Sequence, residues 1–386
     1  MSDGLLGRSA VELGALLQTR ELSPVELLEA QLERIDGLNP QLNAIVTLRG
    51  DGARAEAVAA ERRAARGRRR GPLDGIPFTV KDVIATAGMR TTMGSRLFAD
   101  HIPTWTAPAV ARLQGVGAIL VGKTNCPEFG LDPHTDNLLF GPTLNPLDAA
   151  RTPGGSSGGE GSAVAAGLAG FGIGSDYGGS LRWPAQCNGI HALRPTPGLV
   201  PGTGLLPSDG TLSMLGPSSV SLLGAAQVIG PLARSVGDLS AVLEAIAGAH
   251  TSDPRSVPVA ARPVAGVDVG ALACAWLDGE GAFEVSDELV VTVEGAATAL
   301  AGSLSRVEAA RPAGFERAEP IYAAYRAADG LSLHRQLAAG REDELTDTMR
   351  TWFSEVRSAG VDEFQDLAAQ RDRLRADVLE FMDTFP

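Results

Sequence analysis

Two lysines and two glycine–serine loops are the residues of this chain best suited to chemistry. Lys81 and Lys123 are the only lysines among 33 Lys+Arg residues, and all the others are arginine. Arginine keeps its proton near neutral pH, whereas a buried lysine can lose it and act as a base. Downstream lie Gly154-Gly155-Ser156-Ser157-Gly158-Gly159 and Ser175-Asp176-Tyr177-Gly178-Gly179-Ser180. This combination predicts a serine hydrolase whose base is lysine rather than histidine.

The second loop has the residue types that a nucleophilic serine requires. Such a serine needs an exposed hydroxyl, a base and nearby N–H donors for the developing oxyanion. Gly178 and Gly179 allow successive N–H groups to point the same way before Ser180, because no Cβ obstructs the turn. Either loop alone could be a flexible Gly/Ser turn. The prediction depends on both loops occurring together with an upstream lysine.

Other motifs in the chain suggest different chemistry but lack the required context. The segment 154–158 matches the G-x-S-x-G nucleophile elbow, yet 146–153 has the composition of a loop instead of the strand that an elbow requires. The segment 117–124 matches a P-loop, but its intervening residues 118–121 are an apolar strand. Both alternatives are therefore disfavoured. His134 and His191 remain open as members of a Ser-His-Asp triad, and Cys126 and Cys187 are expected to be inert thiols.

Composition places the chain among globular enzymes. It has 386 residues, 44% of them hydrophobic and 20% charged, which is enough to bury a large core. The net charge of -13 argues against nucleic-acid binding, and we interpret the arginine run at 62–70 as a solvated helix end. Three cysteines give neither a disulfide framework nor metal spacing. The start lacks a signal-peptide pattern, and the apolar run 161–174 is too short to span a bilayer, so a cytoplasmic setting is expected.

The hydrophobic pattern predicts alternating helices and strands. Ser9 with Glu12 and Ser23 with Glu26 form capping-box patterns at the start of two N-terminal helices. Further helices are expected at 51–67, 107–115, 158–169, 235–247, 287–302, 318–340 and 361–383. Strands are expected at 76–81, 118–121, 171–175 and 271–276, with a long and functional loop at 126–156. This order predicts an α/β fold with helices on both faces of a mixed sheet.

A series of ordered motifs resembles the amidase signature hydrolases. They are Gly71-Pro72-Leu73-Asp74-Gly75-Ile76-Pro77, Val80-Lys81-Asp82, Gly122-Lys123-Thr124-Asn125, Glu128-Phe129, Phe140-Gly141-Pro142-Thr143, Asn145-Pro146, Arg151-Thr152-Pro153, both serine loops, Arg182 and Leu193-Arg194-Pro195-Thr196. Similarity is weaker at 230–234. The resemblance implies a central mixed, twisted β-sheet with helices on both faces. It implies one amidase domain over 1–386, with an N-terminal helical segment at 1–70, the signature core at 71–250 and a variable segment at 251–386. Relatives usually continue beyond Pro386, so the last core strand is expected to be missing.

The same resemblance implies the roles of individual residues. Ser180 matches the nucleophile, Ser156 the bridging serine that follows a cis peptide bond, and Lys81 the general base. The oxyanion hole is implied to be the backbone N–H groups of Tyr177, Gly178, Gly179 and Ser180. No metal or cofactor is implied. The substrate-pocket candidates are Cys126, Phe129, His134 and Ser157.

The function implied is hydrolysis of a carboxamide to a carboxylate plus ammonia or an amine. We expect a small-molecule amide substrate, no nucleic-acid or membrane partner, and a homodimer as one option. An alternative is the amidotransferase subunit that supplies ammonia to aminoacyl-tRNA, which is disfavoured because 126–129 and 158–160 are more similar to general amidases. Two others are an inactive relative that only binds ligands and an ATPase that uses 122–124.

Overall fold

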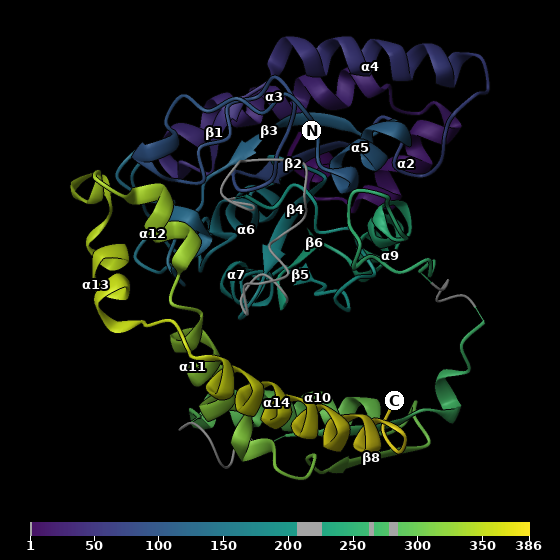
Figure 1. The fold of residues 1–386 in the computed structure, drawn as a ribbon. Coiled ribbons are helices and arrows are strands. Elements are labelled where there is room, and N and C mark those ends of the chain that lie inside the picture. Colours follow the sequence, from purple (N-terminus) through teal and green to yellow (C-terminus); the bar gives the residue numbers. More distant parts are fainter. Residues whose placement is uncertain (1, 207–225, 262–265, 278–284) are drawn as a thin grey trace. The chain divides into compact units, whose positions relative to one another are not determined.

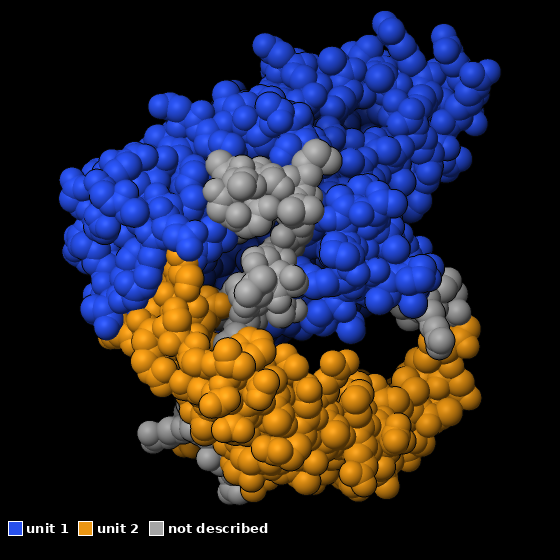
Figure 2. All heavy atoms as spheres, viewed as in Figure 1, with its two compact units in different colours: residues 1–262, 333–354 blue, residues 263–332, 355–386 orange. Residues whose placement is uncertain are grey.

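The computed structural model describes residues 2–206, 226–261, 266–277 and 285–386 (Figure 1). The chain divides into two compact units, one made of 1–262 and 333–354 and the other of 263–332 and 355–386 (Figure 2). The first unit contains every residue to which a catalytic role was assigned above. The single domain expected over 1–386 stays a prediction.

A mixed six-stranded sheet forms the centre of the first unit. Its order is β1-β3-β2-β4-β6-β5. The strands are β1 (Ile45–Leu48), β2 (Pro77–Lys81), β3 (Ile119–Thr124), β4 (Phe171–Asp176), β5 (His191–Ala192) and β6 (Val228–Ala233). β2 is parallel to both β3 and β4, whereas β1, β5 and β6 pair antiparallel with their neighbours. The expected α/β class with a mixed sheet is confirmed.

The central strands are buried along their whole length. Every residue of β2, β3, β4 and β6 is buried, because helices cover both faces of the sheet (Figure 1). The rings of Phe78 and Phe171 stack across the β2–β4 pair with centroids 5.3 Å apart. On the side of α3 (Pro24–Leu42) and α4 (Gly50–Ala65), Leu28, Leu32 and Ile35 pack with Ile119 and Val121. Such strands are recognised by continuous apolar runs instead of alternation.

Six helices of the first unit begin within one residue of a predicted start, whereas those at 182–188 and 347–355 were not predicted. The described ones are α1 (Ser2–Leu6), α2 (Ala10–Thr19), α3 (Pro24–Leu42), α4 (Gly50–Ala65), α5 (Pro108–Gly115), α6 (Gly158–Ala165), α7 (Arg182–Asn188), α9 (Val236–Ile246), α12 (Ser332–Ala338) and α13 (Asp347–Glu355). Both capping boxes are confirmed, with Ser9 and Glu12 at α2 and Ser23 and Glu26 at α3. None of the described helices combines the length and apolarity needed to cross a bilayer.

The described part of the second unit contains a small parallel sheet and three helices. The elements are β7 (Ala273–Trp276), α10 (Asp287–Leu300), β8 (Arg306–Ala309), α11 (Ala318–Asp329) and α14 (Val361–Met382). The single helix expected over 318–340 is wrong. It is broken after Asp329, because Gly330 and Leu331 have φ of 67° and 49°, and α12 (Ser332–Ala338) begins after the break. A residue with positive φ ends a right-handed helix.

The arginine run contributes more to the fold than the expected solvated helix end. Arg63 pairs with buried Asp74. Arg69 donates to the carbonyl oxygens of Gly14 and Asp74, and Arg70 donates to that of Gly115. All three guanidinium groups tie the end of α4 to the rest of the first unit. Arg63 and Arg69 are partly buried, so the expectation is wrong for these two, whereas Arg70 is exposed as expected.

Helix α6 approaches the sheet closely because glycines face it. Gly172 in β4 lies below Glu160 of α6, and a Cβ at Gly172 would lie 2.0 Å from Glu160 Oε2. A Cβ at Gly159 would lie 2.4 Å from the carbonyl oxygen of Asn125. A side chain at Gly159 would meet backbone atoms and push α6 away from the strands, whereas a side chain at Gly172 would displace the buried carboxyl group of Glu160.

We expect Gly172→Ala to destabilise the protein by about 1–3 kcal/mol, because overpacking this contact forces the buried carboxyl group of Glu160 out of its place. Urea unfolding followed by circular dichroism measures this change. The control is Gly237→Ala in α9, whose Cβ would meet nothing closer than 3.8 Å and which is expected to be neutral or stabilising. Equal stability of the two variants would contradict the close packing of the Glu160 carboxyl group against Gly172.

Candidate active site

Lys81 lies at the carboxyl end of β2 and is fully buried. Its Nζ is 2.6 Å from Ser156 Oγ and 3.1 Å from Ser175 Oγ. Ser175 belongs to β4, which runs parallel to β2. Because the carboxyl ends of parallel strands meet at the same edge of a sheet, the two side chains come together there. The amine therefore faces two hydroxyl groups in a buried setting.

Burial makes Lys81 suitable as a base. It lowers the pKa of Lys81 from 10.5 to about 8, although the nearby acidic groups of Cys126, Asp176 and Glu160 partly oppose this. An ammonium group loses its hydration when it is buried, so the neutral amine becomes more favourable. A substantial share of the molecules can thus hold neutral Lys81 at mildly basic pH.

Ser156 stands directly before α6, and its position depends on a glycine neighbour. The Gly155–Ser156 peptide bond is cis, as the family resemblance implies. A Cβ at Gly155 would lie 2.5 Å from the carbonyl oxygen of Asp132, so the backbone at 132–134 can approach only a glycine. Gly130 covers the other side of the pair, because a Cβ there would lie 3.4 Å from Ser156 Oγ and 3.6 Å from Lys81 Nζ.

Ser180 lies on the loop between β4 and α7, and Asp176 holds this loop in place. The carboxylate of Asp176 accepts hydrogen bonds from the N–H groups of Gly179 at 2.9 Å and Leu181 at 3.0 Å. Gly179 has φ of 118°, which favours glycine. The Ser180 carbonyl oxygen accepts the N–H of Ser157 at 3.2 Å, which joins the two serine loops. The Ser180 side chain itself is partly exposed.

Two arginines complete the support of this loop. Arg182 donates two hydrogen bonds to Asp176 at 3.1 Å, and Arg194 lies 3.4 Å from the same carboxylate. Burial alone would raise the pKa of Asp176, but the bonds from Arg182 and from the N–H groups of Gly179 and Leu181 lower it below its ordinary value. Asp176 is therefore an ionised anchor beneath an accessible loop.

The four N–H groups assigned to an oxyanion hole are not equivalent. Gly178 is exposed, and Tyr177, Gly179 and Ser180 are partly exposed, so the loop can be reached by a substrate. The Gly179 N–H already donates to Asp176. The oxyanion role of Tyr177, Gly178, Gly179 and Ser180 stays a prediction.

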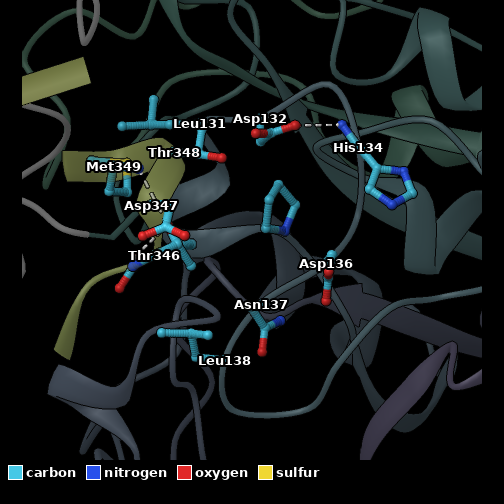
Figure 3. A pocket seen from close by; sticks show the side chains of 12 residues that line it. Leu131, Asp132, His134, Asp136, Asn137, Leu138, Thr346, Asp347, Thr348 and Met349 are labelled. Atoms are coloured by element: carbon cyan, nitrogen blue, oxygen red, sulfur yellow. Dashed lines mark hydrogen bonds between the residues drawn. The ribbon is translucent and has the colours of Figure 1, made fainter. Parts of the chain in front are cut away.

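A pocket of about 270 Å³ lies beside the segment that covers Lys81 and Ser156 (Figure 3). Its walls come from two distant parts of the chain, and Figure 3 shows their side chains. The lining residues are Pro127, Glu128, Leu131, Asp132, His134, Asp136, Asn137, Leu138, Thr346, Asp347, Thr348 and Met349. Of the four substrate-pocket candidates, His134 lines this pocket. Cys126, Phe129 and Ser157 are buried and are absent from its lining.

Glu128 holds the two walls of this pocket together. Its Oε1 accepts the Ser95 hydroxyl at 2.6 Å, and its Oε2 accepts the N–H and hydroxyl of Thr346 at 2.8 and 2.9 Å. Next to it, the ring of Phe129 contacts that of His334 edge to face, with centroids 5.1 Å apart. The segment 333–354 is thus fixed against the long loop at 126–156.

Comparison with known proteins agrees with this architecture. The sequence model of the family described as Amidase matches residues 26–382. The chain belongs to the amidase signature family. Members of this family are hydrolases that act on amide C–N bonds.

The curated relatives of this chain include a glutamyl-tRNA(Gln) amidotransferase subunit of Heliobacterium modesticaldum, which is 35% identical over 367 residues, 92% of this chain and 72% of the relative. The corresponding protein of Anaeromyxobacter sp. strain K is 42% identical over 253 residues, 66% of this chain. That match spans about half of the relative, 48% of its length. Among solved structures, fatty acid amide hydrolase superposes with a TM-score of 0.84 at 27% identity, covering 99% of this chain and 66% of that one.

The structure bears differently on the alternatives that the sequence left open. His134 contacts Thr152 at 2.7 Å, His191 is exposed in β5, and within the described ranges neither hydrogen-bonds to Ser180 or Ser156. Burial raises the pKa of Cys126 to about 12, which agrees with an inert thiol. No strand directly precedes 154–158, where all residues are described, and 122–124 lies buried inside β3. The nucleophile-elbow and P-loop interpretations are therefore excluded.

Ser175 is a site residue that the sequence reasoning missed. It was quoted only as the start of the second loop, yet its hydroxyl contacts Lys81. Its signal depends on the order of the strands, because only adjacency of β2 and β4 brings Ser175 to Lys81. Sequence spacing alone does not contain that information.

We expect Asp176→Asn to destabilise the protein by about 2–3 kcal/mol. Breaking a buried ion pair costs about 3–5 kcal/mol, and the value is reduced here because Arg182 is half exposed. Chemical denaturation at neutral pH measures the change. Asp148→Asn is the matched control, since Asp148 and its partner Arg151 are exposed, and it should change stability by less than about 0.5 kcal/mol. An Asp176→Asn variant as stable as this control would refute the anchoring role.

Proposed function

We propose that this chain is an amidase that cleaves carboxamides through a Ser180 acyl-enzyme, with Ser156 and Lys81 as the proton relay. The observation that carries the proposal is the buried contact of 2.6 Å between Lys81 Nζ and Ser156 Oγ. The link between Ser157 N–H and the Ser180 carbonyl oxygen supports it, because it keeps the relay close to the nucleophile loop.

Acylation begins with neutral Lys81. The Ser156 hydroxyl gives its proton to the Lys81 amine and accepts the proton of Ser180, whose oxygen attacks the amide carbon. N–H groups of the loop at 177–180 stabilise the negative charge on the carbonyl oxygen. As the C–N bond breaks, the proton returns from Lys81 through Ser156 to the leaving nitrogen, and ammonia or an amine departs.

Deacylation repeats the relay with water. Ser156 accepts a proton from the attacking water and passes its own to Lys81, so that a hydroxide equivalent adds to the ester carbon. When the tetrahedral intermediate collapses, the proton returns to Ser180 and the carboxylate product is released. The cycle restores neutral Lys81. We also propose that the pocket at His134 receives part of the substrate, because Leu131 in its wall directly follows Gly130, which lies next to the Lys81–Ser156 pair.

We expect a fluorophosphonate to form one adduct with the wild-type protein and none with Ser180→Ala. Lys81→Ala and Ser156→Ala should slow the labelling by about 10²- to 10⁴-fold, the contribution typical of general acid–base catalysis. Intact-mass spectrometry over time measures both effects. The matched control is Ser162→Ala. Ser162 is a buried serine of α6 whose hydroxyl donates to the Leu144 carbonyl oxygen and does not contact Lys81, so labelling of this variant should be unchanged.

A folded wild-type protein that forms no adduct would contradict the amidase proposal and favour a relative that only binds ligands. An adduct that persists in Ser180→Ala would instead contradict the choice of nucleophile. Circular dichroism of each variant separates loss of folding from loss of reactivity.

A second function is supported by the two curated relatives, both of which are named as components of glutamyl-tRNA(Gln) amidotransferase. In that role the same relay would release ammonia from glutamine within a complex. The amidotransferase role and the homodimer that the sequence suggests are therefore further proposals, to be tested with partners.

Ammonia release distinguishes the two functions. We expect the isolated chain to hydrolyse aliphatic and aryl carboxamides, and its glutamine hydrolysis to change less than about twofold when the other components of an amidotransferase are added. A glutaminase activity that appears only with those components, by more than about tenfold, would favour the amidotransferase. Ser180→Ala serves as the blank in both assays.

A further inference from the structure

Besides Asp176, the structure contains another buried acid beside the relay, and the proposed mechanism assigns it no role. Glu160 is the third residue of α6, four positions after Ser156, and its side chain is fully buried. A carboxyl group is rarely buried unless its oxygens have partners. Its neighbours therefore indicate what it does.

The carboxyl group of Glu160 bridges the two strands beneath Lys81. Its Oε2 contacts the hydroxyl of Thr79 at 2.6 Å, and its Oε1 contacts the hydroxyl of Thr124 at 2.8 Å. Thr79 precedes Lys81 by two residues on β2, and Thr124 pairs with Lys81 in the register of β3. One side chain thus connects the helix that follows Ser156 to both strands around Lys81.

A glycine on the neighbouring strand leaves room for the Glu160 carboxyl group. Gly172 of β4 pairs with Thr79, and the absence of a side chain there leaves room for the carboxyl group. The hydroxyls of Thr79 and Thr124 can each donate or accept a hydrogen bond. Both contacts can therefore persist whether Glu160 is ionised or protonated, and the charge can change without loss of the bridge.

From this geometry we propose that Glu160 is a positioning residue for the relay: it ties the turn at Ser156 to the two strands around Lys81, and its carboxylate charge acts on the Lys81 amine. The inference rests on the proposed Ser-Ser-Lys mechanism. It assigns Glu160 no contact with the substrate, and the residue acts only through Lys81 and the turn at Ser156.

The charges around the pair give the sign of this effect. Lys81 is influenced by Cys126 after β3, by Asp176 at the end of β4 and by Glu160 on α6, and Asp82 follows it in the chain. Lys123 of β3 also influences Glu160. Burial raises the pKa of Glu160 to about 8, in the same range as that of Lys81. An ionised Glu160 favours the ammonium form of Lys81, so removal of its charge should lower the pKa of Lys81.

The test follows fluorophosphonate labelling of the full chain between about pH 6 and pH 10. Labelling requires neutral Lys81 and therefore rises with pH through its pKa. In Glu160→Gln, which retains the size and hydrogen-bonding capacity of the side chain, the midpoint should move to lower pH by about 0.5–1 pH unit. The plateau rate should stay within about threefold of wild type. In Glu160→Ala the plateau should fall by about 10- to 100-fold, because the turn at Ser156 is no longer held.

Variants of Thr124 test the same effect without changing Glu160. The test therefore does not depend on whether the Glu160 variants fold. Thr124→Val removes one hydrogen bond that favours the ionised carboxyl group, so it should move the midpoint in the same direction by a smaller amount, and Thr124→Ser should restore it. A midpoint equal to that of wild type in both Glu160→Gln and Thr124→Val would overturn the inference. A wild-type protein that does not label would overturn the proposed function itself, and this inference with it.

Discussion

The burial of the Lys81 amine is the constraint on which the rest of the first unit depends. A lysine in water is an ammonium ion at neutral pH and cannot accept a proton. β2 lies between β3 and β4 in the middle of the sheet, and this central place excludes water from Lys81 and lowers its pKa. The same group at a sheet edge would regain hydration and remain charged. The position of one strand in the sheet order thus determines the chemistry available at its end.

A buried base can serve an exposed nucleophile only if the connection between them is rigid. Ser180 is partly exposed, but the loop that carries it is held from below by Asp176 and from the side by Ser157. The support is electrostatic on one side, through Arg182 and Arg194, and steric on the other, through the close approach that Gly155 permits. The site therefore requires two kinds of residue. Glycines allow the backbone segments to approach each other, and charged groups hold the loop in place.

The sequence predicts those helices and strands whose pattern lies in a short stretch of neighbouring residues. Apolar runs identify β2, β3 and β4, and capping boxes locate α2 and α3. β6 was not predicted, because Gly230 and Pro231 lie inside it, and proline usually argues against a strand interior. It is nonetheless paired with β4 from Phe171 to Asp176. β1 is only four residues long, and the break at Gly330 depends on a backbone angle. The contacts of Ser175 and Glu160 depend on strand order, which no local pattern encodes.

Composition alone does not show which of the two lysines is the base. Both are fully buried, and burial lowers the pKa of each to about 8, so rarity and pKa do not distinguish them. Their partners do. Lys123 donates to the carbonyl oxygen of Ile84 and to the Thr86 hydroxyl at 3.3 Å, near the charge of Asp82. A carbonyl oxygen has no proton to give, so these contacts favour an ammonium ion with a structural task. Lys81 faces two hydroxyls instead, and a hydroxyl can donate its proton to a neutral amine. Whether a buried lysine acts as a base or has a structural role therefore depends on the atoms that surround its amine.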